Sequence, residues 1–158
     1  MLDRCGCRRV AVVSSTARTP SLVARERAFG DAAAACGVEA SVIRAGPTGY
    51  AAGFEAGRIL LSGSGRPDAA FCVTDLLACG FMDAARREFG LAIPADLCVI
   101  GFDDIEQAGW AAYDLTTFRQ PIDAIADHIM TVIDTPADAA GRSCFQAEPV
   151  WRRSVRPR

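Results

Sequence analysis

Hydroxyl and carboxylate side chains follow three short apolar runs of the chain, and these are the residues best suited to chemistry. They are Ser14, Ser15 and Thr16 after the first run, Thr74 and Asp75 after the second, and Asp103 and Asp104 after the third. In an open parallel sheet, ligands bind outside the carboxyl ends of the strands, where loops and helix N-termini gather. An edge rich in these groups suits hydrogen bonding to a polyol.

The same residues do not assemble a catalytic group. None of them stands beside a His or Cys with a partner base, and no Gly-x-Gly-x-x-Gly motif follows the first apolar run. Asp103 and Asp104 are adjacent, and neighbouring residues on an extended segment point to opposite sides, so they cannot readily flank one bond. We therefore expect no enzyme activity, no catalytic residue and no cofactor.

Metal binding is also not indicated. His128 lies in an apolar helical stretch with no second ligand nearby in sequence, and the segment from Cys5 to Cys7 lacks the two-residue gap of a zinc site. The two cysteines of that segment are expected to be frayed N-terminal thiols. Other cysteines fall in apolar stretches, where a reduced thiol behaves as a small hydrophobe; these are Cys36, Cys72, Cys79 and Cys98.

A scaffold of alternating strands and helices must position the polar residues. We expect strands over residues 9–13, 38–43, 68–73 and 97–102, and helices over residues 21–36, 51–61 and about 75–89. Short apolar strands separated by helices are typical of βαβ units around a parallel sheet that is covered on both faces. The predicted fold class is α/β, with three αβα layers.

Details of the helices can be predicted as well. The first helix should place Leu22, Ala28, Ala32 and Ala35 near one face, and Gly37 fits a left-handed helix cap. Thr74 or Asp75 can accept the first backbone N–H groups of the third helix, and Asp75 is expected to be a helix cap near the site rather than a ligand contact. Beyond Asp103 the alternation stops, and we expect an extended segment over 115–118, a helix over 121–133, a connector over 134–143 and a final extended segment over 148–155.

Composition restricts the function further. The chain has 158 residues, of which 51% are hydrophobic, which fits one globular core. Its net charge of −2 provides no basic field to neutralise the phosphates of DNA. No apolar run reaches the roughly 18 residues of a membrane span, and Asp3 and Arg4 stand where a signal peptide needs apolar residues. We expect a cytoplasmic protein without membrane contact.

Several segments together carry a family resemblance. In order, they are Ser14-Ser15, Arg27-Ala28-Phe29-Gly30, the stretch 67–72, the stretch 74–80, Ile93-Pro94-Ala95-Asp96-Leu97-Cys98-Val99-Ile100-Gly101-Phe102-Asp103-Asp104, and Leu115-Thr116-Thr117-Phe118-Arg119-Gln120-Pro121. This series resembles the effector-binding domain of LacI/GalR transcriptional regulators over about residues 8–155. The resemblance implies a periplasmic-binding-protein-like type I fold, mostly its C-terminal lobe.

The resemblance also implies roles for particular residues. Arg27, Asp103 and Gln120 match effector-binding positions and should converge on one cavity, with Thr74 and Ser15 as further contacts. Where the family often places an aromatic residue near position 48, this chain has Tyr50 two positions later. The effector implied is a sugar or related polyol.

Lobe and dimer boundaries follow from the same resemblance. Residues 8–114 and 144–155 would form one lobe, 116–133 the hinge crossing and a remnant of the other lobe, and 1–7 and 156–158 the tails. The apolar side chains of the crossing helix, which include Ile122, Ile125, Ile129 and Ile133, would then lack a packing surface. A homodimer interface is implied at Tyr50, Phe54, Phe81, Ile105 and Trp110.

In the complete regulator, a helix-turn-helix domain, which we expect this chain to lack, would contact DNA, and the effector would shift the populations of two hinge states. Three alternatives stay open from the sequence. A periplasmic sugar-binding protein shares the architecture but needs a secretion signal and would rarely keep seven cysteines. A flavodoxin-like or Rossmann enzyme is the second alternative, and a nonfunctional remnant is the third.

Overall fold

The main sheet has four parallel strands. The structure is a computed structural model that describes residues 6–133 and 143–156. Its strands are β1 (Arg9–Ser14), β2 (Glu39–Arg44), β3 (Ala69–Cys72) and β4 (Cys98–Ile100), in the spatial order β2-β1-β3-β4. Val10 of β1 pairs with both Ala40 of β2 and Ala69 of β3, and Ala69 pairs in turn with Cys98 of β4. All four carboxyl ends therefore lie along one edge.

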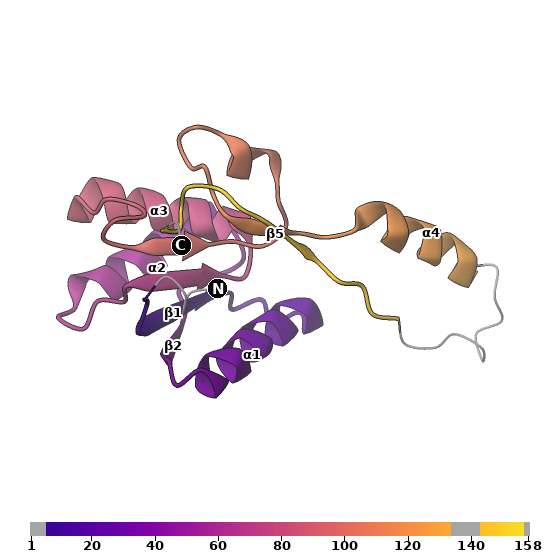
Figure 1. The fold of residues 1–158 in the computed structure, drawn as a ribbon, viewed down its shortest axis with the longest axis horizontal. Coiled ribbons are helices and arrows are strands. Elements are labelled where there is room, and N and C mark those ends of the chain that lie inside the picture. The colour runs from indigo at the N-terminus through magenta and orange to yellow at the C-terminus, as the bar shows by residue number, and fades with distance from the viewer. Residues whose placement is uncertain (1–5, 134–142, 157–158) are drawn as a thin grey trace.

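Three helices cover this sheet. They are α1 (Pro20–Ala35), α2 (Tyr50–Ser62) and α3 (Asp75–Phe89). The chain runs from β1 outward to β2 and then back across to β3 and β4. Because such crossovers are right-handed, α1 lies on one face and α2 and α3 lie together on the other (Figure 1). The predicted α/β fold with three αβα layers is confirmed.

The core sits between the sheet and the pair α2 and α3. The strands β1, β3 and β4 are buried almost throughout, whereas β2 is an edge strand in which Val42 is 45% exposed. The largest fully buried side chains of α3 are Leu77, Phe81 and Met82. Continuous apolar strands are what a sheet covered on both faces requires, so the hydrophobic runs of the sequence predicted these elements correctly.

The helices α2 and α3 approach each other backbone to backbone. A Cβ atom added at Gly80 would lie 2.0 Å from the carbonyl oxygen of Tyr50, and one added at Gly53 would lie 2.1 Å from the carbonyl oxygen of Leu77. Side chains at either position would force the helices apart. The two glycines therefore set the spacing of the layer that covers the sheet beneath the candidate site.

Helix α1 faces the sheet with Leu22, as predicted, but the three alanines predicted beside it are turned away. Leu22 and Ala33 are buried, and the ring of Phe29 stacks on Phe71 of β3 with 4.6 Å between centroids. The predicted inner residues Ala28, Ala32 and Ala35 are exposed. The prediction was wrong by about one residue of helical rotation, roughly 100°, because a helix with many alanines does not distinguish its faces by hydrophobicity. Gly37 has a positive φ of 67°, as its predicted capping role requires.

The last part of the chain leaves the sheet. It contains the short 3-10 helix η2 (Glu106–Gly109), β5 (Thr117–Arg119), α4 (Ile122–Ile133) and β6 (Glu148–Val150). The strands β5 and β6 pair antiparallel, and the backbone before β5 bonds to the end of β4, since the Gly101 N–H donates to the Thr116 carbonyl at 2.9 Å. Figure 1 shows α4 standing away from the sheet and its helices.

None of the residues of α4 is buried. Ile122 is 63% exposed, Ile129 is 52% exposed and Ile133 is 69% exposed, so the expected unpacked apolar side chains are present. The predicted connector falls almost entirely on residues 134–142, which lie outside the described residues. Within the described ranges, no helix combines the length and apolarity that a membrane crossing needs.

Candidate functional site

Three polar side chains meet at the carboxyl edge of the sheet. The Gln120 amide donates to Oδ1 of Asp103 at 2.7 Å, and Nη1 of Arg25 lies 3.1 Å from the same oxygen. Arg25 also donates to the Val73 carbonyl at 2.9 Å, and its guanidinium lies 3.8 Å above the ring of Phe102. The strand order reverses between β1 and β3, and ligands bind at such a switch point.

Asp103 is the centre of this group. Its side chain is 26% exposed. Burial raises the pKa of Asp103, while the positive charge of Arg25 and the hydrogen bond from Gln120 oppose that rise. Its backbone has a φ of 125°, in a region that L-residues rarely adopt. A partly buried carboxylate with a raised pKa in a strained backbone is typical of a ligand-binding residue.

The neighbouring Asp104 has a different role. Its φ is also positive, at 56°, and its side chain is only 6% exposed. Arg152 lies 2.7 Å and Arg119 lies 2.6 Å from its carboxylate oxygens. Burial opposes ionisation, but the hydrogen bonds from Arg152 and Arg119 outweigh it and lower the pKa of Asp104. Asp104 thus binds both β5 and the segment after β6 to the end of β4. The sequence analysis did not predict this role for Asp104.

Arg27 does not join this group. It is 82% exposed and lies 3.9 Å from Asp31 on the outer face of α1. Residues two apart on a helix point about 200° apart, so Arg25 and Arg27 cannot both face the sheet edge. The predicted convergence of Arg27 with Asp103 and Gln120 is therefore wrong for Arg27. The spacing of Arg25 could have identified it as the inward-facing arginine. It lies three residues after Leu22 and four before Phe29, which are the two large apolar residues of the inner face.

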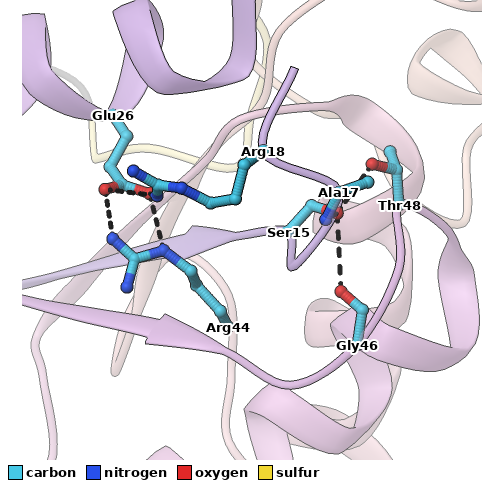
Figure 2. A network of polar contacts seen from close by, with 7 residues as sticks. All are labelled: Ser15, Ala17, Arg18, Glu26, Arg44, Gly46 and Thr48. Carbon is cyan, nitrogen blue, oxygen red and sulfur yellow. Dashed lines mark hydrogen bonds and ion pairs between the residues drawn. The ribbon is translucent and has the colours of Figure 1, made fainter. Parts of the chain in front are cut away.

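Ser15 and Thr74 lie at the same edge but are engaged by their own loops. The Ser15 hydroxyl accepts from the Ala17 N–H at 3.0 Å and from the Thr48 hydroxyl at 2.9 Å, and Figure 2 shows how these residues lie. It also donates to the Gly46 carbonyl at 3.4 Å. Thr74 caps α3 by accepting from the Leu77 N–H at 3.4 Å. Both hydroxyls thus hold the loops after β1, β2 and β3 in place.

Of the two residues predicted to cap this helix, Thr74 is the cap and Asp75 is not. Thr74 has the extended backbone of an N-cap residue, and Asp75 is already the first residue of the helix. The Asp75 carboxylate is fully buried and accepts from the Thr117 hydroxyl at 2.6 Å and from the Ile105 N–H at 3.0 Å. It therefore connects α3 to β5 and to the loop after β4, directly beneath the candidate site.

A cavity opens beside Asp103 on the side of α4. It has a volume of about 510 Å³ and is lined by Asp103, Asp104, Arg119, Gln120, Pro121, Ile122, Asp123 and Ala124. Its walls thus come from the polar edge of the sheet and from the first turn of α4. Among the described residues, no three His, Cys, Asp or Glu side chains come together as a metal site would require.

A second polar cluster lies at the ends of β1 and β2. Glu26 forms ion pairs with Arg44 and with Arg18, the latter at 3.1 Å (Figure 2). Burial of Glu26 works against its charge, but hydrogen bonds from Arg44, Ser14 and Arg18 lower the pKa of Glu26 to about 2. The cluster holds α1 against the edge strand, on the element that supplies Arg25.

Replacing Glu26 by glutamine is expected to destabilise the chain by roughly 2 kcal/mol at pH 7. The folded-state pKa of about 2 lies below the ordinary value of 4.5. The stabilisation is therefore present above pH 4.5 and is lost as the pH falls toward 2. Urea unfolding at pH 7, 5, 4 and 3 should show the wild-type and Glu26→Gln curves approaching each other. The control is Glu55→Gln, which removes an exposed ion pair with Arg58 and should change the free energy of unfolding by under about 1 kcal/mol. If the difference in unfolding free energy between the wild type and Glu26→Gln does not decrease at acidic pH, this role for Glu26 is contradicted.

The residues predicted for a dimer interface are only partly accessible. Phe81 is completely buried, so it cannot contact another molecule, and its inclusion was wrong. It packs between α2 and the sheet, a position that a helix pattern alone does not distinguish from an exposed one. Tyr50 is 38% exposed with its hydroxyl donating to Asp83 at 2.6 Å, Trp110 is 48% exposed, and Phe54 and Ile105 are half-buried.

A parallel sheet with helices on both faces and a polar group at its carboxyl edge defines an α/β ligand-binding lobe. Residues 1–155 match the family described as periplasmic binding protein-like domain. The transcriptional repressor PurR of Salmonella paratyphi B is 41% identical over 75 residues, which are 48% of this chain and 22% of that protein. The chain belongs to this family and, within it, to the effector-binding domains of LacI-type regulators.

Solved structures agree with this assignment. A sugar-binding LacI-family regulator from Escherichia coli, solved with phosphate, is 25% identical with a TM-score of 0.83, and the match covers 98% of this chain and 57% of that one. The lac repressor dimer bound to operator and an anti-inducer shares the fold, with 23% identity, a TM-score of 0.87, and coverage of 98% and 55%. This chain thus spans little more than half of the solved chains. The relatives are regulators, which favours this class over a periplasmic protein or an enzyme.

Proposed function

We propose that the chain is the ligand-sensing, dimerising portion of a LacI-type transcriptional regulator, and that its effector is a small sugar or related polyol. The observation that carries the proposal is the meeting of Arg25 and Gln120 on one oxygen of Asp103, beside a cavity of about 510 Å³. These side chains come from α1, from the end of β4 and from the end of β5. Such convergence from separate elements is what a binding site requires.

The chemistry of the group suits hydroxyl recognition. A carboxylate accepts from two vicinal hydroxyls at once, and such charge-assisted bonds are stronger than neutral ones. The Gln120 amide can donate and accept, and the planar guanidinium of Arg25 presents several donors in a fixed geometry. We assign the effector contact to Arg25 in place of Arg27, and we assign Ser15 and Thr74 to the support of the surrounding loops.

The domain arrangement is part of the proposal. Residues 8–114 and 144–155 form one lobe, and residues 116–133 cross toward a second lobe, with Asp104 fixing both crossings through Arg119 and Arg152. Two observations support this. The apolar side chains of α4 are exposed, and the solved relatives extend well beyond the region that this chain matches. A second lobe would cover α4 and close the cavity.

In the complete regulator, an effector held between the lobes favours one hinge state, which changes how a dimer presents its DNA-binding domains. We place the dimer contacts of this chain at Tyr50, Phe54, Ile105 and Trp110, with Trp110 as the anchor because large exposed aromatic residues often dominate interfaces. Contact with DNA would be made only through a separate helix-turn-helix domain. We therefore propose a cytoplasmic location for the working regulator.

Because the chain forms half of the cleft, it should bind effector weakly by itself. Calorimetry with a panel of sugars and polyols is expected to give dissociation constants of about 1 mM or weaker, which corresponds to roughly 4 kcal/mol of binding free energy. Asp103→Asn should weaken even this binding. A micromolar dissociation constant for the chain alone would contradict the half-cleft arrangement.

A further inference from the structure

Two cysteines and one arginine meet at the amino edge of the sheet, opposite the candidate effector site. Cys7 lies just before β1, Cys98 is the first residue of β4, and Arg156 lies near the end of the chain. Nε of Arg156 is 3.4 Å from the Cys98 sulfur, and its Nη2 is 3.6 Å from the Cys7 sulfur. The two sulfurs thus flank one guanidinium group. Cys7 is only 3% exposed, so it is not the frayed thiol that its position predicts.

The pair differs electrostatically from the other buried cysteines. Burial raises the pKa of Cys72, and it raises the pKa of Cys79 to about 12, as expected for inert core thiols. At Cys98, the neighbouring Cys7 thiol and, to a smaller extent, the Arg156 guanidinium lower the pKa. The neighbouring Cys98 and burial raise the pKa of Cys7. Of the two sulfurs beside the guanidinium, Cys98 is therefore the one that is favoured as a thiolate.

A small oxidant can approach the pair from the side of Cys7, because Cys7 lines a cavity and Cys98 does not. A cavity of about 290 Å³ is lined by Gly6, Cys7, Arg8, Cys36, Gly37 and Val38. The segment that carries Cys7 precedes β1 and is held to the sheet chiefly by the Asp68 carboxylate, which accepts from the Arg8 and Arg9 N–H groups.

We propose that Cys7 and Cys98 form a redox site that hydrogen peroxide converts to a disulfide. The Cys98 thiolate attacks one peroxide oxygen, the O–O bond breaks, and hydroxide leaves, giving a sulfenic acid on Cys98. The Cys7 sulfur then attacks the Cys98 sulfur, the S–O bond breaks and the S–S bond forms. The hydroxide released first and the hydroxyl released second take up protons and leave as water. Both thiols are oxidised and one peroxide is reduced to two waters.

The disulfide would also act on the C-terminal segment. Once the Cys98 sulfur is bonded to Cys7, it no longer carries the negative charge that attracts Arg156. Two residues earlier, Ser154 is bonded to β4, since its hydroxyl donates to the Val99 carbonyl at 2.6 Å and accepts from the Thr116 N–H at 2.8 Å. Oxidation therefore changes the electrostatic support of the segment that returns from β6 to the sheet.

Peptide mapping tests the site. The reduced full chain is treated with hydrogen peroxide at pH 6, free thiols are blocked with N-ethylmaleimide, and tryptic peptides are identified by mass. A Cys5→Ser background is used because Cys5 and Cys7 share one tryptic peptide. We expect the peptides of Cys7 and Cys98 to be joined with the loss of two hydrogen atoms. Linkage of either residue to Cys36, or oxidation confined to the exposed Cys36 and Cys144, would overturn the proposal.

The rate of the reaction tests the role of the thiolate. Between pH 8 and pH 6, the reaction of an ordinary thiol with a pKa near 8.5 slows nearly a hundredfold, whereas disulfide formation here should slow less than about tenfold because the pKa of Cys98 is lowered. Arg156→Gln should reduce the rate at pH 6 by about tenfold, and Arg156→Lys should restore part of it. An unchanged rate in Arg156→Gln would contradict the arrangement. A Cys98→Ser variant should form no disulfide at Cys7. If that variant does not fold, the linked peptide of the Cys5→Ser protein still shows whether Cys7 and Cys98 form a disulfide.

Discussion

Replacing Gly80 by alanine is expected to destabilise the chain by roughly 3 kcal/mol, because the added methyl group has no space. It would lie 2.0 Å from the Tyr50 carbonyl oxygen and 2.7 Å from the Phe54 nitrogen, and both of these atoms belong to the backbone of α2. Backbone atoms cannot move aside as a flexible side chain can. The two helices α2 and α3, which together cover the core, would therefore have to move apart. Urea unfolding at pH 7 measures the loss.

Gly30→Ala is the matched control for this prediction. Gly30 also lies inside a helix, α1, but a Cβ atom there meets nothing within 4 Å. The same substitution should therefore stabilise the chain by up to about 1 kcal/mol, because alanine is the better helix former. The change in the free energy of unfolding should therefore have opposite signs for Gly80→Ala and Gly30→Ala. A Gly80→Ala variant as stable as the wild type would show that α2 and α3 are not in backbone contact.

Replacing Asp75 by alanine is expected to cost about 3 kcal/mol, because the Thr117 hydroxyl and the Ile105 N–H would lose their buried acceptor. Asp75→Asn should stay within about 1 kcal/mol of the wild type at pH 5. The amide oxygen can accept from Ile105, and the amide nitrogen can donate to the Thr117 oxygen. The difference between the two variants, measured by urea unfolding, isolates the hydrogen bonds from the charge.

The charge of Asp75 gives this prediction a pH dependence. Burial raises the pKa of Asp75 above its ordinary 3.8, although the Thr117 and Ile105 hydrogen bonds oppose the rise. The folded chain thus holds this proton more tightly than the unfolded chain. Its contribution to stability is present below the unfolded pKa and is lost as the pH rises through the folded pKa. Asp75→Asn cannot ionise, so its free energy of unfolding should increase relative to that of the wild type between pH 4 and pH 8. If the difference between the two free energies stays constant over this range, a raised pKa of Asp75 is contradicted.

Much of the fold could be predicted from local patterns. The strands β1, β3 and β4 are short apolar runs bounded by glycine, proline and polar residues, so hydrophobic periodicity placed them to within a few residues. Their carboxyl ends had to share an edge once the sheet was parallel. That constraint, together with the family resemblance, brought Asp103 and Gln120 together correctly, as their 2.7 Å hydrogen bond shows.

The remaining features depend on tertiary contacts that local patterns do not contain. The rotation of α1 is set by the stacking of Phe29 on Phe71, and it decides between Arg25 and Arg27. Phe81 is buried because α2 packs over α3, which no periodicity within α3 indicates. The meeting of Cys7 with Arg156 joins residues at opposite ends of the chain.

The central claim is that a hydroxyl-rich ligand binds at the carboxyl edge of the sheet around Asp103. The most direct measurement is a backbone ¹⁵N NMR titration of the chain with a panel of sugars and polyols, each raised to tens of millimolar. We predict that at least one ligand shifts the amide signals of Asp103, Asp104 and Gln120 with a millimolar dissociation constant, and that Asp103→Asn removes these shifts. Shifts located elsewhere, or no shifts with any ligand of the panel, would contradict the account.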